Sequence, residues 1–153
     1  MQKTEDFILN RLKWKADKFG LPTEFAFYFN DLSSETKNHL VSQIDKANSG
    51  TPVLYFTKPT NEWTLVCSRQ VICCDNTKLV SLSISDIKRI LPTAFDITLI
   101  GQPIDIKTVK KKSEWDTIKI IDKQDESNIF YANKGEDLFA LWNILLMAKQ
   151  LYE

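Results

Sequence analysis

The sequence predicts an α+β fold in which about seven short antiparallel strands close into a barrel capped by a C-terminal helix. Apolar residues recur at helical spacing near both ends of the chain, in residues 6–19 and 138–151. Short runs rich in β-branched and aromatic residues, separated by turn residues, fill the interval from residue 53 to residue 132. With 153 residues, 43% of them hydrophobic, the chain is long enough to bury one substantial core.

Residues 1–50 are predicted to form a helical extension to the barrel. Ile8, Leu12 and Ala16 share one face of a helix over residues 6–19, and Gly20 is typical of a helix end. A second helix is expected from Ser33 or Ser34 to about residue 47, where Asn, Ser and Gly end it. The aromatic stretch at residues 24–30 favours neither helix nor strand.

Residues 51–153 are predicted to form one compact unit, the barrel with its C-terminal helix. Hydrophobic runs bounded by Pro, Asn, Asp and Thr indicate the strands. We expect strands at residues 52–57, 63–68, 70–74 and 78–84 and then, after Pro92, at residues 96–100, 104–109, 115–121 and 128–132.

The C-terminal segment is predicted to be a long and strongly apolar helix. Glu136 and Asp137 lie in its first turn, where the helix dipole favours acidic groups. Leu138, Leu141 and Leu145 begin an apolar face that neighbouring residues widen. A helix this apolar packs on more than one side, so we expect it to lie across the sheet or to plug the mouth of the barrel.

Two segments carry a family resemblance. Residues 63–72, Trp-Thr-Leu-Val-Cys-Ser-Arg-Gln-Val-Ile, resemble the strand–turn–strand of bacterial pleckstrin-homology-like (PH-like) domains. Residues 82–90, Leu-Ser-Ile-Ser-Asp-Ile-Lys-Arg-Ile, resemble the apolar segment that follows in those domains. The Thr usual in the family is Cys67 or Ser68 here, depending on register. The resemblance covers roughly residues 51–153. It implies a barrel that binds lipid headgroups, peptides or proteins without catalysis.

Charge and cysteine content narrow the classes of function. Twenty Lys and Arg residues balance twenty Asp and Glu residues, so the excess of positive charge that nucleic-acid binding needs is missing, and we expect no nucleic-acid partner. Three Cys residues, two of them adjacent (Cys73 and Cys74), do not form a disulfide framework. Because no apolar run reaches the length of a membrane span and no leader is evident, we expect a cytoplasmic protein.

A cluster of basic residues is the first candidate site. It consists of Lys107, Lys110, Lys111, Lys112 and Trp115. Lysines beside a Trp suit the surface of an anionic membrane or a lipid headgroup. The other interpretation is a solvated hairpin loop whose charges keep an edge strand from aggregating.

The aromatic residues Phe25, Phe27 and Phe29 are the second candidate site. They share one parity, so in an extended chain they lie on one face. Either they pack the N-terminal layer against the barrel, or they form an interface with a partner, where aromatic residues are favoured.

Catalytic and metal sites are not expected. His39 is the single His and lies on a predicted helix, away from the predicted strand that carries Cys73 and Cys74, and neighbouring strand residues point to opposite faces. No metal, cofactor or enzymatic activity is therefore predicted. We expect a non-catalytic cytoplasmic module that binds a protein partner, for example an immunity-type inhibitor of a toxin. Binding to anionic membranes through the basic loop is the alternative.

Overall fold

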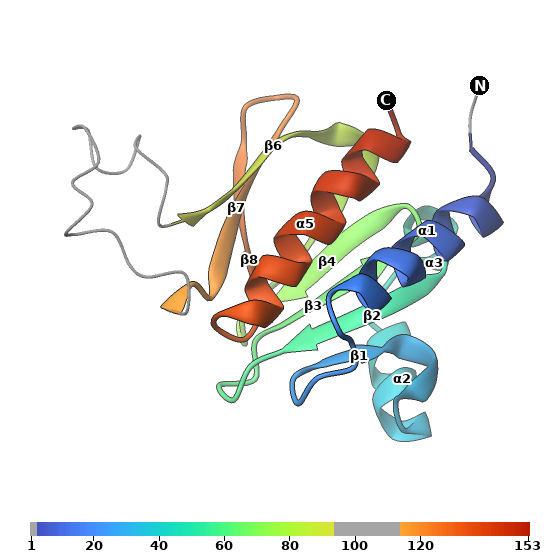
Figure 1. Ribbon diagram of the computed structural model, residues 1–153, viewed down its shortest axis with the longest axis vertical. Coiled ribbons are helices and arrows are strands. Elements are labelled where there is room, and N and C mark those ends of the chain that lie inside the picture. The colour runs from blue at the N-terminus through green and yellow to red at the C-terminus, as the bar shows by residue number, and fades with distance from the viewer. Residues whose placement is uncertain (1–2, 94–113) are drawn as a thin grey trace.

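The computed structural model describes residues 3–93 and 114–153 and shows a mixed α+β fold, which confirms the predicted class (Figure 1). The helices are α1 (Glu5–Lys18), α2 (Ser34–Val41), α3 (Lys46–Ser49) and α5 (Glu136–Leu151), with 3-10 turns η1 (Phe29–Asp31) and η2 (Ile84–Asp86). The strands are β1 (Ala26–Tyr28), β2 (Pro52–Thr57), β3 (Trp63–Cys67), β4 (Gln70–Cys74), β5 (Leu79–Ser83), β6 (Ile87–Pro92), β7 (Thr117–Asp122) and β8 (Ser127–Tyr131).

The described strands form two antiparallel sheets and not the single closed sheet that the sequence predicted. One sheet has five strands in the order β1-β2-β3-β4-β5, and the other has three in the order β6-β7-β8. The turn η2 separates β5 from β6, so β6 pairs with β7 instead of continuing the first sheet. The predicted barrel closure is therefore not observed within the described ranges, and the PH-like fold stays a prediction. The strands predicted at residues 96–100 and 104–109 lie outside the described residues.

Side chains connect the two sheets where β3 meets β8. The hydroxyl of Thr64, a fully buried residue, donates to the carbonyl oxygen of Tyr131 at 2.6 Å and accepts from the Tyr131 N–H at 3.1 Å. The thiol of Cys73 on β4 lies 3.3 Å from the carbonyl oxygen of Ile129. These bonds satisfy peptide groups that a neighbouring strand would otherwise pair, so side chains and not a backbone ladder connect β8 to the larger sheet.

Helices α1 and α5 lie side by side over the strands (Figure 1). α5 packs across β6 and β7, which confirms that the C-terminal helix lies across a sheet. The indole N–H of Trp142 donates to the carbonyl oxygen of Ile90 on β6 at 3.2 Å. At the other end of α5, the buried carboxylate of Asp137 accepts from the Thr23 hydroxyl at 2.9 Å, and burial raises the pKa of Asp137 above its usual range.

The N-terminal residues are an integral part of the main core. Ile8, Leu12 and Ala16 on α1 and Ala26 on β1 belong to the same buried cluster as Leu141 on α5. α1 begins at Glu5, one residue before the predicted start, and the Thr4 side chain caps it by accepting from the Phe7 N–H at 3.2 Å. The predicted helical extension thus supplies one of the two helices that cover the strands, and it also supplies β1.

The second predicted helix, which was expected to run to residue 47, is two short helices. Ser33 caps α2 by accepting from the Thr36 N–H at 3.2 Å. Asp45 accepts from the Ala47 N–H at 3.1 Å and starts α3 as a new helix. A side-chain oxygen at Asp45 that caps a new helix competes with continuation of the old one. Leu40 from α2 is buried in a smaller second cluster with Phe29 and Trp63.

Candidate functional site

The predicted basic site is only partly within the described residues. Lys107, Lys110, Lys111 and Lys112 lie outside them. The structure describes Trp115, which is 8% exposed and packs edge-to-face on Trp142 with ring centroids 6.4 Å apart. Because its indole is in the core, Trp115 does not have the exposed position that an interfacial membrane contact requires.

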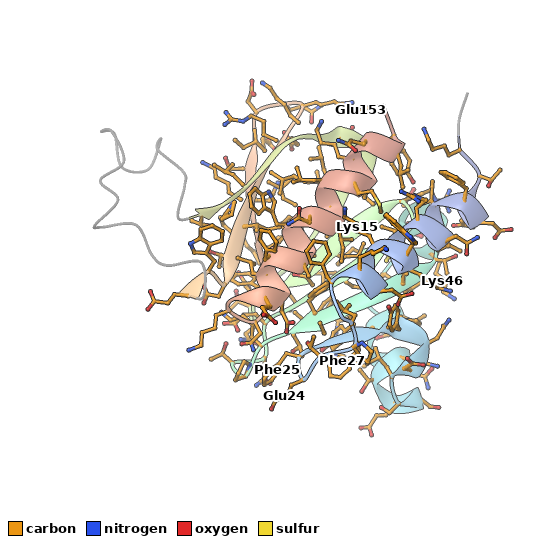
Figure 2. All side chains as sticks on the ribbon, in the orientation of Figure 1. Lys15, Glu24, Phe25, Phe27, Lys46 and Glu153 are labelled. Atoms are coloured by element: carbon orange, nitrogen blue, oxygen red, sulfur yellow. The ribbon has the colours of Figure 1, made fainter. Side chains whose placement is uncertain are left out.

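The three N-terminal phenylalanines have different surroundings. Phe29 is buried in the second cluster, so it has the core role that the sequence left open. Phe27 is half-buried on β1 and stacks on Tyr55 of β2, with ring centroids 6.4 Å apart. Phe25 is half-buried just before β1, and its carbonyl oxygen accepts from the Thr57 N–H at 2.8 Å. Figure 2 labels Phe25 and Phe27, which lie close together at this margin of the five-stranded sheet.

The cysteines are not arranged for nucleophilic chemistry. Cys67 and Cys73 are buried, and burial raises the pKa of each thiol to about 12. A thiol with such a pKa is protonated at neutral pH and is a poor nucleophile. His39 is exposed on α2, and its Nε2 lies 2.8 Å from the Gln43 side-chain nitrogen. Residues 3–93 and 114–153 contain no group of three or more His, Cys, Asp or Glu residues placed to hold a metal ion.

The outward side of α1 is a surface that the sequence did not single out. Phe7, Arg11, Trp14 and Lys18 follow one another at intervals of four, three and four residues, which places them on one face of the helix. This face, called here the outer face of α1, is opposite the buried Leu12 and its neighbours. Phe7 is 45% exposed and Trp14 is 43% exposed, which is unusual for side chains of this size.

Three cations surround the Trp14 indole. The Arg11 guanidinium lies 4.2 Å from the ring centroid, the Lys18 ammonium 5.4 Å and the Lys15 ammonium 5.9 Å (Lys15 is labelled in Figure 2). None of the three takes part in an ion pair with any residue of the described ranges. The outer face of α1 therefore combines exposed aromatic surface with positive charge that no ion pair within residues 3–93 and 114–153 neutralises.

A cleft of about 640 Å³ lies where the first turn of α1 meets the last turn of α5. Its wall includes Glu5, Arg69 and Tyr152. The hydroxyl of the buried Ser68 donates to Glu5 Oε1 at 2.7 Å and accepts from the Thr51 N–H at 2.9 Å, and the Tyr152 hydroxyl donates to the Ser68 carbonyl oxygen at 2.5 Å. The bond from Ser68 is the main cause of the lowered pKa of Glu5. Hydrogen bonds to Ser68 therefore join three segments of the chain at this cleft. The wall carries charges of both signs, with Lys3 and Arg69 beside Glu5 and Glu153.

No family model matches this chain, and no curated protein matches it. No helix in residues 3–93 or 114–153 combines the length and apolar character that a bilayer crossing requires. Within residues 3–93 and 114–153, the outer face of α1 is a surface that places two exposed large aromatic side chains beside cations.

Proposed function

We propose that this chain is a non-catalytic binding protein that recognises a protein partner with an acidic surface through the outer face of α1. One observation carries the proposal. Two large aromatic side chains, Phe7 and Trp14, are exposed on the same helical face as cations that have no described ion-pair partner.

The physical basis is the usual composition of binding hot spots. Trp and Arg are enriched among the residues that dominate binding energies, and truncating such an anchor costs about 2 kcal/mol or more. Arg11 covers one side of the Trp14 ring and fixes its position, so little conformational entropy is lost when a partner packs on the ring. Unneutralised cations around the anchor speed the approach of an acidic partner and disfavour basic ones.

Other features support binding over catalysis. The buried thiols have raised pKa values, and the exposed imidazole of His39 is bonded to a glutamine. The resemblance to PH-like domains also favours a binding role, because those domains mostly bind without transforming a ligand. An immunity-type inhibitor is one specific form of the proposal, with the toxin as the partner and an acidic region of its surface as the contact.

An anionic membrane is the second candidate for the same face. Each cation near an anionic surface contributes about 1 kcal/mol, so Arg11, Lys15 and Lys18 would contribute about 3 kcal/mol together. Because a dissociation constant of about 1 mM already corresponds to about 4 kcal/mol, electrostatic attraction by these residues alone gives weak membrane binding. A protein partner would add to this attraction the burial of both aromatic rings, Phe7 and Trp14.

The test compares partner capture by matched variants of the full chain. The immobilised protein is exposed to a lysate of its source cells, and retained proteins are identified by mass spectrometry. Trp14→Ala and Phe7→Ala should each lose a specific partner that the wild type retains. Lys13→Ala, an exposed substitution on the same helix but off the outer face, should keep that partner.

Two results would contradict the proposal. A partner retained equally by all three variants binds elsewhere on the protein. Sedimentation of the wild type with phosphatidylserine vesicles, abolished by Trp14→Ala but not by Lys13→Ala, would assign the face to membranes instead. Circular dichroism spectra identical to that of the wild type would show that the variants remain folded, since Phe7 and Trp14 are both exposed.

A further inference from the structure

We propose that β5 pairs, antiparallel, with β5 of a second copy of this chain, about a two-fold axis at Ser81. This pairing would join the five-stranded sheets of two molecules into one continuous sheet. The inference concerns a surface distinct from the outer face of α1, so it does not rest on the proposed function.

The register of β5 shows which backbone groups are free. The Ile84 N–H donates to the Arg69 carbonyl oxygen at 2.9 Å, and the Asp75 N–H donates to the Lys78 carbonyl oxygen at 3.3 Å. Lys78 and Ile84, which bond to the β4 side, are both even-numbered. In an antiparallel pair every second residue bonds to the neighbouring strand, so the odd-numbered residues of β5 point their N–H and C=O groups away from β4.

The free groups therefore belong to residues 79, 81 and 83. Within the described ranges β4 is the only strand that pairs with β5, and no hydrogen bond joins the outer edge of β5 to another segment. The N–H groups of Ser81 and Ser83 and the C=O groups of Leu79 and Ser81 are available there.

Among the other edges of the described sheets, β1 and β6 are protected and β8 lies against β3, whereas β5 is not protected. Strand β1 has three residues, and its Ala26 carbonyl oxygen already accepts from the Thr23 N–H at 2.8 Å. Strand β6 carries the exposed Lys88 and Arg89, has a bulge and ends in Pro92. Short length, charges, bulges and prolines are the devices that prevent edge-to-edge pairing.

Strand β5 has none of those devices. It has five residues, Leu-Val-Ser-Leu-Ser, without charge or proline, and its register with β4 is unbroken. Its first residue, Leu79, is 42% exposed, which makes it one of the few large apolar side chains on the described surface. An uncharged and uninterrupted edge strand with exposed apolar surface is a site for strand addition.

A second copy fits this edge because β5 is complementary to itself. About a two-fold axis at Ser81, each Ser81 N–H meets the partner's Ser81 C=O, and each Ser83 N–H meets the partner's Leu79 C=O. The centre of the strand carries no charge that would repel its copy. The two ends of β5 carry opposite charges, since Lys78 precedes the strand and Asp86 lies beyond its end in η2. In this register Lys78 lies opposite the other copy's Ile84, and the other copy's Asp86 is two residues further along the chain.

Analytical ultracentrifugation of the full chain over a range of concentrations tests the proposal. The average mass should rise from 17.7 kDa toward twice that value. Ser81→Pro removes an outward N–H that the β4 ladder does not use, so the fold should persist while the dimer dissociation constant rises about tenfold or more. Ser81→Thr is the matched control, because it keeps the N–H group, and should dimerise like the wild type.

A charge-reversal pair makes the test independent of proline. Lys78→Glu should weaken the dimer, and Lys78→Glu combined with Asp86→Lys should restore it, since both contacts are then reversed together. A wild-type chain that stays monomeric up to about 1 mM would overturn the proposal. So would self-association that survives both Ser81→Pro and Lys78→Glu, because that association would use another surface. Binding of a synthetic extended peptide to a strictly monomeric chain would assign the edge to a peptide partner and would equally refute self-pairing.

Discussion

Replacement of Gly50 by alanine should destabilise the protein strongly. Gly50 lies between α3 and β2 with φ +74° and ψ −156°, a conformation that residues with a side chain rarely adopt. An added Cβ would lie 2.0 Å from the Ser68 hydroxyl oxygen and 3.1 Å from both Arg69 Nε and Glu5 Oε1. The substitution therefore introduces backbone strain and a steric overlap at a buried position.

The magnitude follows from these two effects. Backbone strain at such a position costs about 1–3 kcal/mol. The Ser68 hydroxyl can move away only by giving up its bonds to the Thr51 N–H and to Glu5, which adds about 1–2 kcal/mol. Gly50→Ala should thus lower the free energy of unfolding by about 2–5 kcal/mol, a large fraction of the stability of a domain this size.

Gly20→Ala is the matched control for this experiment. Gly20 also has positive φ, +83°, but a Cβ there would meet nothing within 4 Å. Gly20→Ala should lower the free energy of unfolding only by the strain of the left-handed conformation, about 1 kcal/mol. Urea unfolding followed by circular dichroism measures both variants. A Gly50→Ala variant no less stable than Gly20→Ala would refute the steric argument. So would a Ser68→Ala substitution whose cost is the same with and without Gly50→Ala, because the two side chains would then not interact.

Two further predictions concern ionisable groups. With pKa values raised from 9.0 to about 12, the thiols of Cys67 and Cys73 hold about a thousandfold less thiolate than an ordinary cysteine. A thiol reagent at pH 8 should therefore modify the half-buried Cys74 first, as mass spectrometry of the native protein will show; early labelling of the other two would mean that the core opens readily. Hydrogen bonds, chiefly from the Thr77 hydroxyl, lower the pKa of Asp75 from 3.8 to about 2, so its contribution to stability holds above about pH 4 and is lost as the pH falls toward 2. Asp75→Asn should flatten the pH dependence of the urea midpoint in this interval, and an unchanged slope would contradict the role of this turn.

The helices and strands were predicted correctly where the spacing of apolar residues and the turn residues at the segment ends indicate the same element. The strand–turn–strand at residues 63–72 is observed as β3 and β4, and the apolar C-terminal segment is α5. Strand β6 was missed for a physical reason. Its bulge places the exposed Lys88 and Arg89 together between the buried Ile87 and Ile90, and this spacing of three removes the alternation that identifies a strand.

The candidate site could not be predicted in the same way. Helical spacing shows that Phe7 and Trp14 share a face, but it does not show which face of a helix the core will cover. In α1 the face of Leu12 is covered and the aromatic face is not, and this choice depends on the packing of α1 against α5 and β2. Likewise, the run of lysines before Trp115 suggested that this side chain is exposed. In the structure it is buried against Trp142, a contact that the local sequence does not indicate.

The place of β1 at the margin of the larger sheet has a consequence for shortened forms of the chain. A fragment starting at Thr51 would lack both β1, which pairs with β2, and α1, which covers it. The hydrogen-bonding groups of β2 and a strip of bare core residues would then face water. Such a fragment should aggregate and adhere to unrelated proteins, so the strand-rich part in isolation would report false partners.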